Sequence, residues 1–164
     1  MKKVVIGIGV PGSGKTTLLK AFAHNNKYIY ICPDDIRAEL TGDASNQTKN
    51  DEVWKEAYLR TEKELCAGNS VVFDATTADF EQRKHLLGFV RLKGAEKIQG
   101  IYVNVSLETA KERNMQRERK VPESVIEQMY KALTNFPPRV SDGFDSILLV
   151  DGNRDKAEVG LNLE

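Results

Sequence analysis

Cysteine, unbalanced charge and long apolar runs are scarce or absent in this 164-residue sequence. The two cysteines, Cys32 and Cys66, lie far apart without metal-ligand residues beside them, which argues against a disulfide scaffold and favours a reduced, cytoplasmic setting. Basic and acidic residues number 24 each, so the net charge of zero gives no global sign of a nucleic-acid or membrane partner. No apolar run approaches the roughly 18 residues of a membrane-spanning helix, so we expect no membrane association.

The length fits one domain with a single core, because domains average roughly 150 residues. We therefore treat residues 1–164 as one domain. The opening Met1-Lys2-Lys3 leads straight into an apolar stretch, so no signal peptide is expected. No internal repeat, low-complexity segment or linker divides the sequence.

The most informative stretch is Gly9-Val10-Pro11-Gly12-Ser13-Gly14-Lys15-Thr16. It follows the apolar run 4–8 and precedes a segment of helical character at 17–23. The pattern G-x-x-x-x-G-K-T between a strand and a helix is the phosphate-binding P-loop. Its glycines let backbone N–H groups converge on a phosphate, and the helix N-terminus adds its positive dipole end. We therefore expect a nucleoside triphosphate, with ATP and Mg²⁺ as cofactors.

Each residue of the motif has an expected role. The Lys15 ammonium should contact the β- and γ-phosphates, and the Thr16 hydroxyl should ligate Mg²⁺. The residues expected to bind the nucleotide are Gly12, Ser13, Gly14, Lys15, Thr16 and Thr17. The simpler alternative is a glycine-rich turn between a strand and a helix.

Short apolar runs alternate with helical segments along the whole chain. The expected strands are 4–8, 28–32, 70–73, 98–105 and 147–150, and the later helices are 51–66, 80–92, 107–117 and 122–133. Alternation of this kind predicts an α/β fold, a three-layer α/β/α P-loop NTPase with a roughly five-stranded parallel sheet. In such a sheet, ligands bind outside the carboxyl ends of the strands.

Two acidic residues and an arginine follow the second expected strand, in Pro33-Asp34-Asp35-Ile36-Arg37. A carboxylate here can take the proton of a hydroxyl acceptor, and we prefer Asp34 to Asp35 for this role. Arg37 can pair with a phosphate on the acceptor. The structural alternative is a helix start with Asp34 as its N-cap, and both roles are compatible.

The third expected strand ends in Asp74, which is typical of the second metal-side carboxylate of a P-loop protein. We expect Asp74 near Mg²⁺. The residues expected around the acceptor are Asp35, Arg37, Asp74, Thr76 and Arg83. The alternatives are that Asp74 caps the next turn and that Arg83 is a solvated helix residue.

A charged segment at 111–120 predicts a helical lid over residues 113–122. Arg113 and Arg117 are four apart and share a helix face, from which they can neutralise the transferring phosphoryl group. An ordinary solvated charged face is the alternative. We also expect Trp54 and Tyr58 in the core, and the loop 151–153 beside the adenine.

Together these motifs resemble the kinase domain of phage-type polynucleotide 5′-kinases. The resemblance rests on the P-loop, on Pro-Asp-Asp-Ile-Arg, on Phe-Asp-Ala-Thr-Thr and on Arg-Asn-Met-Gln-Arg before Val-Pro. It implies that Lys15 and Thr16 hold ATP, that Asp34 is the general base for the 5′-hydroxyl and that Arg37 contacts the acceptor's 3′-phosphate. It also implies that Arg113 and Arg117 are lid arginines, with Arg117 at the reaction centre.

The resemblance makes an ATP-dependent transfer to the 5′-hydroxyl end of DNA or RNA the expected function. The family's enzyme carries a phosphatase domain after the kinase, which this sequence does not include, and Pro33 replaces a polar or basic residue of the family. A kinase for a small-molecule hydroxyl, such as a sugar nucleotide or nucleoside, and a non-enzymatic NTP-dependent switch stay open. So do DNA against RNA, ATP against GTP, and the oligomeric state.

Overall fold

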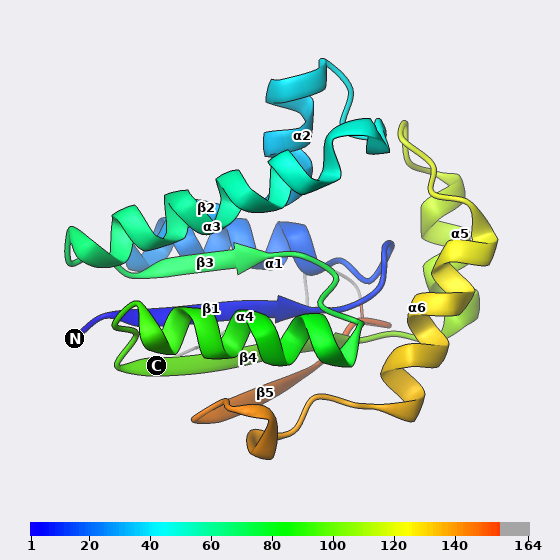
Figure 1. The fold of residues 1–164 in the computed structure, drawn as a ribbon. Coiled ribbons are helices and arrows are strands. Elements are labelled where there is room, and N and C mark those ends of the chain that lie inside the picture. Colours follow the sequence, from blue (N-terminus) through cyan, green and yellow to red (C-terminus); the bar gives the residue numbers. More distant parts are fainter. Residues whose placement is uncertain (155–164) are drawn as a thin grey trace.

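The computed structural model describes residues 1–154, which form a parallel sheet covered by helices on both faces (Figure 1). The strands run in the order β2-β3-β1-β4-β5, and every neighbouring pair is parallel. Their bounds are β1 Lys3–Ile8, β2 Ile29–Ile31, β3 Val71–Asp74, β4 Lys97–Asn104 and β5 Ser146–Asp151. The predicted α/β fold class with a five-stranded parallel sheet is confirmed.

The helices between the strands form the outer layers and the lid. They are α1 Lys15–Asn26, α2 Pro33–Thr41, α3 Asn50–Cys66, α4 Phe80–Leu92, α5 Leu107–Met115 and α6 Glu123–Asn135, with short 3₁₀ helices η1 Gln47–Lys49 and η2 Val140–Asp142. Figure 1 shows α5 and α6 standing beyond the carboxyl ends of the strands, where the lid was predicted. Within residues 1–154, none of the helices has the length and apolar character needed to cross a membrane.

Side chains that alternate along the strands build two cores, one on each face of the sheet. Val5 of β1 packs with Leu19 and Phe22 of α1 on one face. Ile6 packs on the other face with residues of α3 and α4. Trp54 and Tyr58 of α3 lie against this second core, as expected.

The helix boundaries differ from the predictions at two functional positions. Helix α2 has Cys32 as its N-cap and Pro33 as its first residue, so Asp34 is not the N-cap that the structural alternative supposed. Proline fits the first helical position because its missing N–H would have no partner there. Helix α5 ends at Met115 and not at Arg117, because the buried side chain of Asn114 pairs with the backbone of Val121 and closes a loop over 115–120.

Candidate active site

The P-loop wraps tightly between β1 and α1. Gly12 and Gly14 have φ angles of 85° and 89°, a region that favours glycine. A Cβ on Gly12 would also collide with the carbonyl oxygen of Ala110 in α5. Gly14 is the N-cap of α1 and gives no side-chain cap, so the first N–H groups of this helix lie at the loop with no capping side chain. Such a terminus is suited to binding an anion.

Asp74, at the end of β3, collects three donors. The Lys15 ammonium bonds Oδ1, while the hydroxyls of Thr16, at 2.9 Å, and Tyr30 both donate to Oδ2. Burial alone would raise the pKa of Asp74, but the charge of Lys15 and the three hydrogen bonds outweigh it and hold the pKa below its usual value. Asp74 is therefore a buried anion directly beside the first turn of α1.

The predicted metal ligands, Thr16 and Asp74, are thus neighbours. Mg²⁺ in kinase sites is commonly held by one or two carboxylates together with substrate phosphates. One carboxylate and one hydroxyl at the P-loop fit that pattern. Within residues 1–154, no cluster of three or more acidic, histidine or cysteine ligands offers an all-protein metal cage.

The loop after β3 is tied to the P-loop by its backbone. Gly9 N donates to the Thr76 carbonyl at 3.1 Å, so Thr76 lies beside the P-loop as predicted for a site residue. Thr77 has a φ of 50°, which is rare for a β-branched residue, and its buried hydroxyl donates to the Gly7 carbonyl at 2.8 Å. This hydrogen bond fixes the strained turn that follows Asp74.

Asp34 lies in the first turn of α2 with two arginines on its carboxylate. Arg37 Nη1, one turn further along the helix, bonds Oδ1, and Arg119 Nη2 from the lid loop bonds Oδ2 at 2.9 Å. Arg37 is buried and its Nε also donates to Asn50 Oδ1 at 3.2 Å, whereas the Asp34 side chain is 49% exposed. The structure thus pairs the predicted base with the predicted acceptor-binding arginine.

The lid arginines face both sides of the site. Arg113 Nη1 lies 3.4 Å and 3.3 Å from the carbonyl oxygens of Gly12 and Ser13, which places it on the P-loop. Arg117 is half-buried, and burial together with the nearby charge of Arg119 lowers its pKa, while Asp34 acts in the opposite direction. Arg117 is therefore close enough to Arg119 and Asp34 to interact with both charges.

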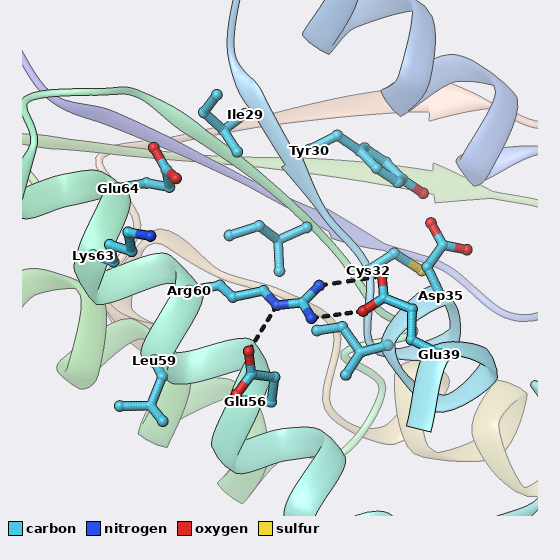
Figure 2. A pocket seen from close by; sticks show the side chains of 12 residues that line it. Ile29, Tyr30, Cys32, Asp35, Glu39, Glu56, Leu59, Arg60, Lys63 and Glu64 are labelled. Atoms are coloured by element: carbon cyan, nitrogen blue, oxygen red, sulfur yellow. Dashed lines mark hydrogen bonds and ion pairs between the residues drawn. The ribbon is translucent and has the colours of Figure 1, made fainter. Parts of the chain in front are cut away.

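Asp35 is the next residue of α2 after Asp34. It is exposed and lines a cavity of about 460 Å³ between β2, α2 and α3 (Figure 2). Figure 2 also shows Arg60 of α3 bonding Glu39 of α2 at 2.6 Å and Glu56 at 2.9 Å, which joins the helix that carries Asp34 to its neighbour. The preference for Asp34 over Asp35 agrees with the pairing of Asp34 and Arg37, and the contact of Asp35 with the acceptor stays a prediction.

Arg83 is a further correction. Its side chain is fully buried, with Nε on Asp142 Oδ2 at 3.1 Å and its two terminal nitrogens on the carbonyl oxygens of Thr77 and Phe136. A guanidinium with these partners joins α4 to η2 and to the end of α6. It is not placed to meet a substrate.

The loop after β5 lies against the P-loop. Gly152 N donates to the Asn104 carbonyl at 2.6 Å, and a Cβ on Gly152 would lie 2.8 Å from the Ser13 carbonyl oxygen. The expected loop 151–153 is thus beside the nucleotide-binding motif.

Three residues at the site were not found from the sequence, namely Tyr30, Thr77 and Arg119. Tyr30 is one of two tyrosines in the apolar run 28–32, and the sequence predicts only that it belongs to a strand. Thr77 follows another threonine, and Arg119 lies outside the Arg113–Arg117 helical spacing. No pattern in the sequence marks these three, because their partners are distant in the chain.

The sheet, the P-loop and the arginine lid define a P-loop kinase. Residues 4–136 match a family model described as an AAA domain, and the chain belongs to that family. It is 30% identical over 176 residues to the "Putative bifunctional polynucleotide kinase/RNA ligase" of Autographa californica nuclear polyhedrosis virus, an alignment that covers 92% of this chain and 24% of the relative. The resemblance to polynucleotide kinases is thereby confirmed, and the chain spans about a quarter of that relative.

Solved structures share the fold at lower identity. A chain of the Pnkp1/Rnl/Hen1 RNA repair complex superposes with a TM-score of 0.74 at 23% identity, over 82% of this chain and 44% of that one. A gluconokinase from Sinorhizobium meliloti 1021 gives 0.65 at 21% identity, over 96% and 86%. A shikimate kinase from Bacteroides thetaiotaomicron gives 0.61 at 16% identity, over 94% and 90%. At these identities the likeness establishes the fold alone.

Proposed function

We propose that the protein transfers the γ-phosphoryl group of ATP to the 5′-hydroxyl end of DNA or RNA. The observation that carries the proposal is the pair of Asp34 and the buried Arg37, which lies under the lid at the carboxyl end of the sheet. A half-exposed carboxylate can accept a hydroxyl proton, and a buried guanidinium beside it suits a phosphate next to that hydroxyl. The polynucleotide kinase relative supports this choice of acceptor.

In the proposed reaction, the acceptor oxygen bonds to the γ-phosphorus as its proton passes to Asp34. The bond from the γ-phosphorus to the bridging oxygen breaks, and ADP leaves. Lys15 and the P-loop N–H groups hold the phosphates, while Arg113 and Arg117 supply positive charge from the lid. Mg²⁺, held by Thr16 and Asp74, would add charge neutralisation when bound. Catalysis here is mostly positioning and electrostatics.

A kinase for a small-molecule hydroxyl is the second candidate. It is favoured by the gluconokinase and shikimate kinase structures, which match this chain over nearly its whole length and most of their own. Those enzymes show that the same sheet and P-loop can serve a compact acceptor. The two candidates differ only in what lies against Asp34 and Arg37.

The test uses γ-labelled ATP, Mg²⁺ and a short oligonucleotide with a 5′-hydroxyl, and a 5′-phosphorylated oligonucleotide serves as control. We expect label on the first only. Asp34→Asn should lower kcat at least about 100-fold with ATP affinity unchanged, because it removes the base. Asp35→Asn is the matched control and should keep full activity, since Asp35 faces the cavity beside β2.

ATP binding without label on DNA or RNA would refute the polynucleotide acceptor and favour a small hydroxyl compound. Equal activity of the Asp34 and Asp35 variants would refute the assignment of the base.

A further inference from the structure

Arg119 joins the lid loop to the opposite side of the site. Its Nη2 donates to Asp34 Oδ2 at 2.9 Å, and its Nη1 donates to the Ala44 carbonyl at 2.7 Å, in the connection between α2 and α3. In Figure 1 this connection and the loop between α5 and α6 approach each other at the top of the molecule. On the acceptor side, the Arg119 guanidinium therefore links the lid loop to two partners, Asp34 and Ala44.

The two arginines on Asp34 are held differently. Arg37 belongs to the same helix as Asp34, is buried and is also fixed by Asn50, so it is a permanent part of the site. Arg119 comes from an irregular loop, and its side chain is 31% exposed. Of the two, Arg119 can leave the carboxylate without disturbing the core.

Arg119 also lies where an acceptor must come. A hydroxyl that gives its proton to Asp34 needs a position within about 2.6–3.2 Å of a carboxylate oxygen. Arg37 occupies one side of that carboxylate and Arg119 covers the other oxygen. An acceptor can approach the exposed side of Asp34 fully only if the Arg119 guanidinium shifts.

The charges around Asp34 provide the reason for such a shift. Two guanidinium groups, those of Arg37 and Arg119, bond the Asp34 carboxylate, and Arg117 lies near enough to interact electrostatically with both Arg119 and Asp34. Arg119 also interacts electrostatically with Asp43, but its two hydrogen bonds go to Asp34 and to a backbone carbonyl, so its guanidinium can still gain from a phosphate partner. A phosphate binds an arginine through two parallel hydrogen bonds, which a single carboxylate oxygen cannot match.

We propose that Arg119 is a specificity-determining residue that senses the acceptor: it holds the lid against Asp34 and moves to a backbone phosphate of the nucleic acid when the acceptor binds. This inference rests on the proposed function and names how that site selects its substrate. Uncharged hydroxyl compounds do not offer Arg119 a new partner, so they do not uncover Asp34. The same contact keeps one Asp34 oxygen engaged, so that oxygen is not available to take a proton from water.

The experiment compares Arg119→Ala and Arg119→Lys with Lys120→Ala, an exposed lid residue of the same charge. For each protein, kcat and KM are measured with a 5′-hydroxyl oligonucleotide and with an uncharged nucleoside. ATP hydrolysis is measured without acceptor, where water attacks the γ-phosphorus, its proton passes to Asp34 and ADP leaves. Thermal melts confirm that each variant is folded.

For Arg119→Ala we expect three changes. The KM for the oligonucleotide should rise about tenfold, as is typical for the loss of one charged hydrogen bond, with the KM for ATP unchanged. The preference for the oligonucleotide over the nucleoside should fall by a similar factor, and acceptor-free hydrolysis should rise about tenfold. Arg119→Lys should recover part of the KM but not the suppression of hydrolysis, because lysine lacks the fork that reaches both partners. Lys120→Ala should behave as the wild type.

Several results would overturn the inference. If the rates of phosphoryl transfer and of ATP hydrolysis fall by the same factor in Arg119→Ala, Arg119 only contributes positive charge to catalysis and does not sense the acceptor. Unchanged hydrolysis in Arg119→Ala, or full suppression in Arg119→Lys, would also refute the sensing role. If the wild type does not label oligonucleotides, the proposed function fails, and a rise in acceptor-free hydrolysis in Arg119→Ala still tests separately whether Arg119 covers Asp34.

Discussion

Replacing Arg83 by alanine should greatly lower the free energy of unfolding and leave acceptor binding intact. The guanidinium is fully buried against Asp142, whose side chain is 6% exposed, so its removal leaves a buried carboxylate without a cation. Breaking a buried ion pair from one side costs about 3–5 kcal/mol. That is a large part of the roughly 5–15 kcal/mol by which domains are stable.

Urea denaturation followed by circular dichroism measures this cost. With a slope of about 2 kcal/mol per molar urea, the midpoint should drop by about 2 M. Arg91→Ala is the matched control, because Arg91 lies on the same helix and pairs with Asp145, but both side chains are about 40% exposed. An exposed pair contributes only about 0–1 kcal/mol, so its midpoint should move by less than about 0.5 M.

The kinetic parameters of the folded Arg83→Ala protein complete the test. At a temperature where it is folded, its KM for the acceptor should stay within about twofold of wild type, well below the effect of a lost charged hydrogen bond. A midpoint close to that of Arg91→Ala, with a large rise in acceptor KM, would refute the structural assignment. Such a result would instead indicate that Arg83 contacts the substrate.

Three further results are expected. Gly12→Ala should abolish ATP binding measured by calorimetry, because the positive φ of Gly12 and the nearby α5 carbonyl exclude a side chain. Gly88→Ala, at an open position in the middle of α4, should instead stabilise the fold by about 0.5–1 kcal/mol. Asn114→Ala should speed proteolysis of the lid loop and lower kcat, because both hydrogen bonds to Val121 are lost; unchanged cleavage would contradict this. Hydrogen bonds from the Ile98 N–H and from Arg91 lower the pKa of Asp145, so its ionised form stabilises the fold. The difference in unfolding free energy between wild type and Asp145→Asn should therefore be present at pH 7 and disappear as the pH falls below about 3.9.

The secondary structure was readable from the sequence because it depends on local patterns. Residues 80–92 form the predicted helix with the predicted bounds, and each expected strand lies within two residues of its observed limits. The position of Asp34 at the carboxyl edge of the sheet also followed from a general rule, since parallel strands end at the same edge of a sheet. Local pattern and sheet topology together placed the predicted base.

The remaining features of the site depend on contacts between distant parts of the chain. Tyr30 reaches Asp74 across 44 residues, Thr77 reaches Gly7 across 70, and Arg119 reaches Asp34 across 85. No periodicity links such pairs. The prediction that Arg83 contacts the acceptor was wrong for the same reason. Its partner Asp142 is 59 residues away, and only the folded chain shows that this helix arginine faces inward.

The likenesses to polynucleotide kinases and to sugar kinases do not conflict, because at these identities the solved structures establish the shared fold and not the acceptor. All of them share the fold of this chain, and a shared fold does not determine the substrate. The acceptor meets residues that follow the strands and the lid, where binding sites diverge most readily. In this chain the guanidinium groups of Arg37 and Arg119 bond one half-exposed carboxylate, and Arg117 interacts electrostatically with it. A neutral polyol would leave that charge unbalanced, whereas a nucleic-acid end brings a phosphate within reach of the hydroxyl to be phosphorylated. The acceptor is therefore best inferred from the charge around Asp34.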